Sequence, residues 1–241
     1  MNIIVTKNFE EMSANAANII SDVIKAKPDC VLGLATGSTP LRVYEMLTEM
    51  EHNGELSFSK TSSINLDEYY PLPPTDPQSY RYFMNKNLFD NITINKDRTY
   101  VPNGLAQDVE QACLEYESII DRLGIDVQIL GIGRNGHIGF NEPGSELFRH
   151  THLTDLTQNT IDANARFFDS PDDVPRHAIT MGIASVFKAK KIILLASGSG
   201  KAEAIAKVVK GNISTDCPAS LLCLHSDVTV ICDEDAYSMC K

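Results

Sequence analysis

Two loops rich in glycine and hydroxyl side chains have the composition of anion-binding segments. The first, TGST at 36–39, follows an apolar run and precedes a predicted helix, so its amides and hydroxyls would lie at the positive end of that helix. A simple helix N-cap would have the same composition. The second, SGSGK at 197–201, adds the cation of Lys201. It lacks the first glycine of a P-loop and the hydroxyl residue after the lysine, so we exclude a nucleoside triphosphate and expect a single phosphomonoester.

A third segment, GIGRNGH at 131–137, has the chemistry to move protons. His137 ends this glycine-framed loop, and Glu142 follows it closely in the chain. An imidazole that is oriented by a carboxylate can transfer protons near neutral pH. The loop also matches GxGxxG, but Pro143 and Gly144 make the following stretch poor helix sequence, and a dinucleotide pyrophosphate needs a helix there. We therefore expect a tight turn that presents His137 and Glu142.

An acidic pair, Asp67 and Glu68, comes after the apolar run SINLD at 63–67 and precedes two tyrosines. In isolation such a pair is equally typical of a surface turn. Opposite a phosphate-binding loop, one of the two carboxylates becomes a candidate general base in a partly dry pocket.

The segments that must position these residues alternate between strand and helix patterns. Apolar runs of strand length occupy 2–5, 30–35, 63–67, 126–130, 191–196 and 228–232. Buried strands separated by helices predict a doubly wound α/β fold, with a mostly parallel sheet covered by helices on both faces. The carboxyl ends of parallel strands meet at one edge of a sheet, so all the polar clusters above are expected to converge there.

Local signals predict where several helices begin and end. Asn8 and Glu11 form a capping box, and Gly124 suits the end of a helix whose apolar residues begin at Val109. Asp76 followed by Pro77 predicts another helix start.

The chain has no repeat, low-complexity linker or break in composition, which predicts a single domain over residues 1–241. The stretch from about 143 to 178 is polar and weakly periodic, and either a lid or an ordinary connecting segment would fit it.

Composition excludes several classes of partner. The formal net charge is −11, which disfavours nucleic acid and anionic membranes. No apolar run is long enough to span a bilayer, and the first residues do not read as a secretory leader. Six cysteines are scattered without a zinc-site or disulfide pattern, so we expect reduced thiols, a cytoplasmic location and no metal.

Five segments occur in the order found in glucosamine-6-phosphate deaminases, which the chain resembles over essentially its whole length: GLATGSTP, INLDEYYPLP, GIGRNGHIGFNEPG, ARFFD and GSGKAEA. The resemblance implies a Rossmann-like sheet and an enzyme without a metal or organic cofactor. It implies a small amino-sugar phosphate as the partner. The implied reaction opens the ring of glucosamine-6-phosphate, moves a proton from C2 to C1, and yields fructose-6-phosphate and ammonia.

The same resemblance assigns roles to individual residues. Asp67 would be the base that removes the C2 proton and returns it at C1. His137 would open the pyranose ring, supported by Glu142 and Asn135. Other family members often carry aspartate where this chain has Asn135, which cannot ionise near neutrality. The phosphate would be held by Gly37, Ser38, Thr39, Arg166 and Lys201.

Two related functions and one unrelated function stay open as alternatives. A 6-phosphogluconolactonase shares the fold and the glycine–histidine loop, but lactonases usually lack the Asn-Glu-Pro that begins here at Asn141. A sugar-phosphate sensor would bind without turnover, and an N-terminal helix-turn-helix is not expected here, because the first strand begins at residue 2. A dinucleotide-dependent enzyme would need added nicotinamide. The sequence leaves the oligomeric state open.

Overall fold

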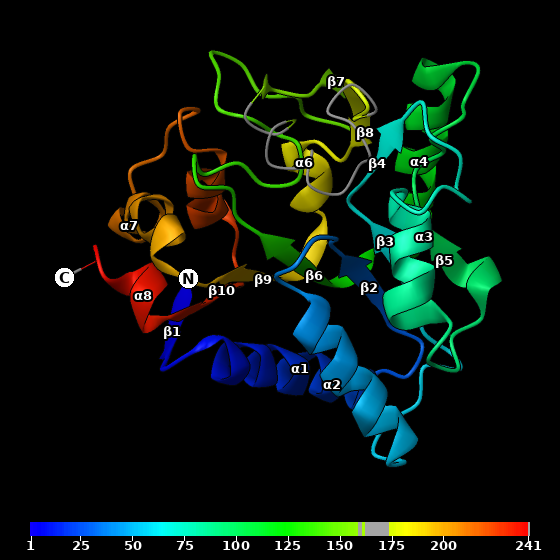
Figure 1. Cartoon of the computed structure of the whole chain (residues 1–241), viewed down its shortest axis with the longest axis horizontal. Coiled ribbons are helices and arrows are strands. Elements are labelled where there is room, and N and C mark those ends of the chain that lie inside the picture. Colours follow the sequence, from blue (N-terminus) through cyan, green and yellow to red (C-terminus); the bar gives the residue numbers. More distant parts are fainter. Residues whose placement is uncertain (159–160, 162–173, 241) are drawn as a thin grey trace.

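The computed structural model describes residues 1–158, 161 and 174–240, and within them a seven-stranded parallel sheet forms the centre of the molecule (Figure 1). Its strand order is β1-β10-β9-β6-β2-β3-β5. The strands are β1 (Asn2–Thr6), β2 (Val31–Leu34), β3 (Ser62–Asn65), β5 (Thr99–Tyr100), β6 (Ile125–Gly131), β9 (Ala189–Ala196) and β10 (Val228–Asp233). Every neighbouring pair is parallel.

Helices cover both faces of this sheet, because its strands are apolar on both sides. Leu32 and Leu34 of β2 pack into one core layer, whereas Val31 and Ala35 pack into the other. The first layer lies under α1 (Phe9–Ala26), α2 (Leu41–His52), α3 (Tyr80–Met84) and the π-helical turn Asn85–Phe89. The second lies under α4 (Val109–Leu123), α6 (Ile183–Val186), α7 (Ala202–Lys210) and α8 (Glu234–Tyr237). The predicted doubly wound fold is confirmed.

Two of the three predicted helix boundaries are confirmed. The Asn8 side chain accepts a hydrogen bond of 2.9 Å from the amide of Glu11 and so caps α1. Gly124 ends α4 with φ of 67°. The predicted start at Asp76 is wrong: Asp76 caps only a turn, through the amide of Gln78, and α3 begins later with Ser79 as its N-cap.

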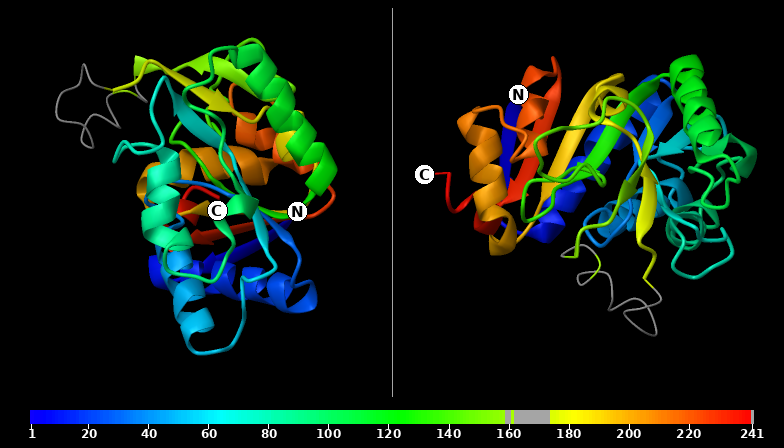
Figure 2. Two further views of the ribbon diagram at one scale, coloured as in Figure 1. Left: turned by 90° about the vertical axis from the view of Figure 1, so that its right-hand side faces the viewer. Right: turned by 90° about the horizontal axis from the view of Figure 1, so that it is seen from above.

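A second, antiparallel sheet lies above the first, on the side opposite α1 and α2 (Figures 1 and 2). Its order is β4 (Asp67–Tyr70), β8 (His177–Thr180) and β7 (His152–Asp155). The chain changes sheets at Leu66, whose amide bonds to Leu34 of the main sheet and whose carbonyl accepts from Met181. The acidic pair expected after a strand at 63–67 therefore lies on a strand of its own.

Part of the segment 143–178, for which the sequence left a lid and a connecting segment open, builds this second sheet. It supplies β7 and the first residues of β8, and residues 159–160 and 162–173 lie outside the described residues. None of the helices in the described ranges is long and apolar enough to cross a membrane.

Candidate active site

The strand order brings the predicted polar loops together. From β2 the chain continues through β3 to β5 on one side, and from β6 it continues through β9 to β10 on the other. Ligands of open parallel sheets bind at such a reversal, beyond the carboxyl ends of the strands. The loops after β2, β6 and β9 are consecutive neighbours there, so TGST, GIGRNGH and SGSGK line one edge.

Asp67 lies beside this edge, at the start of β4, with 6% of its surface exposed. It pairs with Thr180 of β8, and the Thr180 hydroxyl accepts a hydrogen bond of 3.2 Å from the amide of Phe140. A Cβ atom at Gly139 would lie 3.4 Å from the Asp67 carboxylate and 3.0 Å from the Thr180 hydroxyl. The bare backbone of Gly139 thus lets the histidine loop pass directly over the carboxylate.

Burial changes the acidity of this carboxylate. Removal of water raises the pKa of Asp67 to about 8, and the neighbouring charge of Glu68 adds to the increase. A carboxyl group in this state is a far stronger base than an ordinary aspartate, which suits it to proton abstraction.

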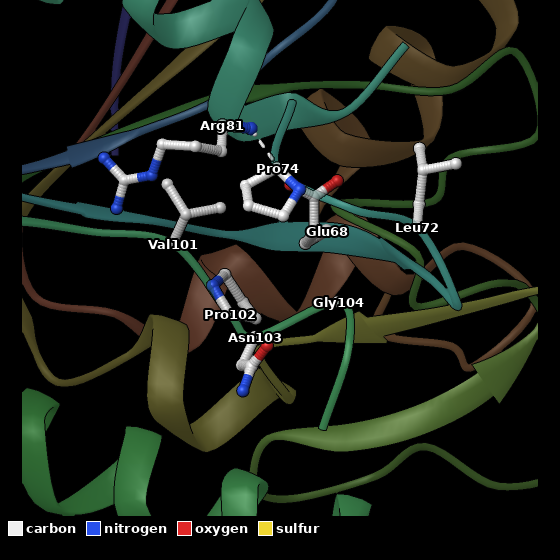
Figure 3. A pocket seen from close by; sticks show the side chains of 8 residues that line it. All are labelled: Glu68, Leu72, Pro74, Arg81, Val101, Pro102, Asn103 and Gly104. Carbon is white, nitrogen blue, oxygen red and sulfur yellow. Dashed lines mark hydrogen bonds between the residues drawn. The ribbon is translucent and has the colours of Figure 1, made fainter. Parts of the chain in front are cut away.

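Glu68 has a different role, because adjacent residues of a strand point to opposite faces. Its carboxylate accepts hydrogen bonds from the amides of Tyr80 (2.8 Å) and Arg81 (2.9 Å) and from the Ser79 hydroxyl (3.1 Å). It therefore satisfies the first turn of α3, which explains why that helix does not begin at Asp76. Glu68 and Arg81 lie on the wall of a pocket of about 230 Å³ (Figure 3), whose lining includes neither Asp67 nor any of the residues predicted to open the ring or bind the phosphate.

His137, Glu142 and Asn135 form a cluster at the tip of the loop after β6. Nδ1 of His137 lies 3.0 Å from Oε1 of Glu142, close but not aligned as a hydrogen bond. The Asn135 amide donates to the other Glu142 oxygen at 2.6 Å, and its carbonyl accepts from the His137 amide at 3.2 Å. The three residues expected to act together are therefore in contact.

The glycines of this loop shape it as expected from the sequence. The amide of Gly133 donates to the His137 carbonyl at 2.9 Å, which closes the turn. A Cβ atom at Gly133 would come within 2.6 Å of the imidazole ring, and Gly136 adopts φ of 89°. Asn141 is structural, because its side chain donates to the carbonyls of Ile138 and Met181.

Two hydroxyls of the TGST loop are not used to cap the following helix. Helix α2 begins after Pro40 without a side-chain capping bond, so the hydroxyls of Ser38 and Thr39 do not serve as N-caps. Gly37 has φ of 90° and is exposed, as a loop that approaches a ligand through its backbone requires.

The SGSGK loop has fewer hydrogen-bond donors available to an anion than its composition suggested. The Ser197 hydroxyl and the Gly198 amide are both bonded to the carboxylate of Asp233 at the end of β10, so they are not available as anion donors. Lys201 lies in the turn directly before α7 and donates to the Ile132 carbonyl at 2.6 Å. Burial lowers the pKa of Lys201, and the nearby charge of Arg134 lowers it further. Arg166, the other expected phosphate ligand, lies outside the described residues.

Two features of the site were missed in the sequence. Tyr69, Tyr80 and Phe140 form an aromatic wall near Asp67, with ring centroids 4.7 Å apart for Tyr69–Tyr80 and 6.2 Å apart for Tyr80–Phe140. The Tyr80 hydroxyl lies near the Thr36 side chain, so this wall adjoins the TGST loop. The second missed feature is Arg134, which lies beside Lys201. Its position inside a glycine motif did not indicate that it could bind a ligand. Among the described residues, no group of three or more His, Cys, Asp or Glu side chains gathers as a metal site would.

Comparison with known proteins gives full-length matches. The family model "Glucosamine-6-phosphate isomerases/6-phosphogluconolactonase" matches residues 6–231. A glucosamine-6-phosphate deaminase of Clostridium perfringens (strain 13 / Type A) is 58% identical over 242 residues, with 100% of both chains covered. The corresponding protein of Halothermothrix orenii is 55% identical, covering 99% of this chain and 100% of its own.

Solved structures give the same result at two levels of similarity. A monomeric glucosamine-6-phosphate deaminase superposes with a TM-score of 0.96 at 50% identity, covering 99% of this chain and 100% of its own. The 6-phosphogluconolactonase of Trypanosoma brucei superposes with a TM-score of 0.77 at 18% identity, covering 98% and 97%. At 18% identity, the similarity to the lactonase shows a shared fold alone.

Proposed function

The chain belongs to the family of glucosamine-6-phosphate isomerases and 6-phosphogluconolactonases, and we propose that it converts glucosamine-6-phosphate into fructose-6-phosphate and ammonia. The full-length deaminase relatives support this activity over lactone hydrolysis, for which the likeness is only distant. The observation that carries the assignment of the site is the buried Asp67 carboxylate under the loop of His137 and Glu142.

Ring opening is the first step and requires two proton movements. The hydroxyl at C1 loses a proton while the ring oxygen gains one, and the C1–O5 bond breaks to give an open aldehyde. His137 can carry these protons, because an imidazole ring has two nitrogens that accept and release protons, and Glu142 lies 3.0 Å from its Nδ1. Asn135 orients Glu142 through its amide but stays neutral.

Isomerisation then depends on Asp67. Its carboxylate removes the proton from C2, which the aldehyde has acidified, and the electron pair forms the C1–C2 double bond. A proton of the C2 ammonium group passes to the aldehyde oxygen, which gives an enolamine. The same proton returns from Asp67 to C1, which leaves a ketimine at C2. Water adds to the ketimine and ammonia departs, so the reaction combines an aldose–ketose isomerisation with hydrolysis of a C=N bond. The raised pKa of Asp67 suits it to both halves of this transfer.

Phosphate binding holds the reacting carbons over Asp67. We assign it to the backbone of Gly37, the hydroxyls of Ser38 and Thr39, and the cation of Lys201. Arg166 is included in the proposed phosphate site because the family resemblance implies that role. A cytoplasmic location, supported by six unpaired cysteines, is also part of it.

The test is to mix the protein with glucosamine-6-phosphate alone and to follow ammonia and fructose-6-phosphate. Equal amounts of both products are expected, and none from the Asp67→Asn variant. Hydrolysis of 6-phosphogluconolactone without ammonia from the amino sugar would reject the proposal in favour of a lactonase. Binding of the amino-sugar phosphate without any product would favour a sensor.

A further inference from the structure

Arg134 lies where the loops after β6 and β9 meet. Its side chain runs along the backbone of Gly200: Nε, Cζ and Nη2 lie 3.4, 3.9 and 4.0 Å from the position that a Cβ atom at Gly200 would occupy. Arg134 is exposed, and the described residues give it no salt bridge to a carboxylate. Its guanidinium is therefore presented to solvent at the edge of the site.

Lys201 approaches the same point from the other loop. Its ammonium group donates to the carbonyl of Ile132, two residues before Arg134 in the chain. The two cations are close enough for the charge of Arg134 to lower the pKa of Lys201. Two neighbouring cations repel each other, and an anion bound between them would offset that repulsion.

The strand order places this pair within the site. The β6 loop lies between the loops of β2 and β9, so Arg134 stands on the central loop, with Lys201 on one side and TGST on the other. His137, three residues further along the same loop, belongs to the catalytic cluster. An anion bound by Arg134 and Lys201 would thus be held on the loop that also carries the ring-opening residue.

We propose that Arg134 is a second phosphate-binding cation of the site, which acts with Lys201 to select the dianionic phosphate ester of the substrate. This inference rests on the proposed function and adds a residue that determines specificity. The guanidinium offers planar N–H donors to phosphate oxygens, and the ammonium offers a point charge. With Ser197 and Gly198 occupied by Asp233, Arg134 supplies donors that the SGSGK loop itself does not.

The experiment compares two esters of glucosamine, the 6-phosphate and the 6-sulfate, at pH 8, where the phosphate carries two charges and the sulfate carries one. The variants are Arg134→Gln, which removes the charge, and Arg134→Lys, which keeps it. Arg122→Ala, on the exposed surface of α4, is the matched control. Steady-state rates give KM and kcat for each ester.

For the phosphate ester, Arg134→Gln is expected to raise KM about tenfold and to keep kcat within about twofold of the wild type. A tenfold change is the lower end of the range for a charge-assisted contact, because Arg134 is exposed. Coulomb energy scales with charge, so the sulfate ester should lose about threefold, the square root of that factor. Arg134→Lys should stay within about threefold of the wild type, and Arg122→Ala should be unchanged. An unaltered KM in Arg134→Gln, or an equal loss for both esters, would overturn the inference.

Calorimetric titration with inorganic phosphate separates this inference from the proposed function. If the wild type releases no ammonia, the proposed function fails, whereas phosphate binding that weakens about tenfold in Arg134→Gln still supports the anion site. Identical phosphate affinity in the wild type and Arg134→Gln would reject Arg134 as a phosphate ligand, whatever the activity.

Discussion

Asp67→Asn should inactivate the enzyme and at the same time stabilise the fold. The wild-type carboxyl is 6% exposed, and burial raises its pKa from 3.8 to about 8. Asparagine has nearly the same shape but carries no charge, so the variant isolates the cost of burying the carboxylate.

The sign of the effect follows from proton binding. Between about pH 5 and pH 7 the unfolded chain has an ionised Asp67, whereas the folded chain keeps it protonated. The folded state therefore binds one more proton, and its stability falls as pH rises. The slope is roughly 1.4 kcal/mol per pH unit and flattens above about pH 8, where the folded carboxyl also ionises. Integrated from about pH 4 to pH 7, the penalty is on the order of 4 kcal/mol.

Urea unfolding of both proteins at a series of pH values measures this difference directly, because all other titrating groups are common to the pair. The stability advantage of Asp67→Asn should be small near pH 4 and grow toward pH 8. In parallel, kcat/KM of the wild type should rise with pH toward about 8, because the base must be ionised, and turnover by the variant should fall by at least 10²–10⁴-fold. A stability difference that does not change with pH would refute the assignment of a buried, protonated Asp67.

Three further substitutions test other parts of the site. Lys201→Ala should raise KM for glucosamine-6-phosphate roughly 10- to 150-fold, the value of a charge-assisted phosphate contact, and steady-state kinetics will measure it. Glu68→Gln should lower the free energy of unfolding by about 1–3 kcal/mol in urea titrations, because its amide group replaces an acceptor that faces the α3 amides, while KM stays unchanged. Gly133→Ala should lower kcat at least about tenfold with an unchanged fold by circular dichroism, since the new methyl displaces the His137 ring; full activity would show that the ring position is not critical.

The sequence by itself determined the architecture and the loops that carry the chemistry. Apolar strands alternating with amphipathic helices leave a doubly wound parallel sheet as the economical solution, and that topology gathers the ends of β2, β6 and β9 at one edge. Signals that depend only on near neighbours in the chain also predicted helix ends correctly, namely the Asn8 cap of α1 and the end of α4 at Gly124. The spacing of His137, Asn135 and Glu142 was informative because all three lie on one short loop.

Only the tertiary structure decided what the polar residues do, because their partners are distant in the chain. Asp67 and Glu68 are equivalent in the sequence, and they differ because β4 turns one toward Gly139 and the other toward the amides of α3. The sequence predicted Ser197 as an anion donor, but in the structure its hydroxyl donates to Asp233 at the end of β10. Arg134 meets Lys201 because β6 and β9 are neighbours in the sheet. Charge, burial and donor availability are set by such long-range packing, which neither composition nor local spacing encodes.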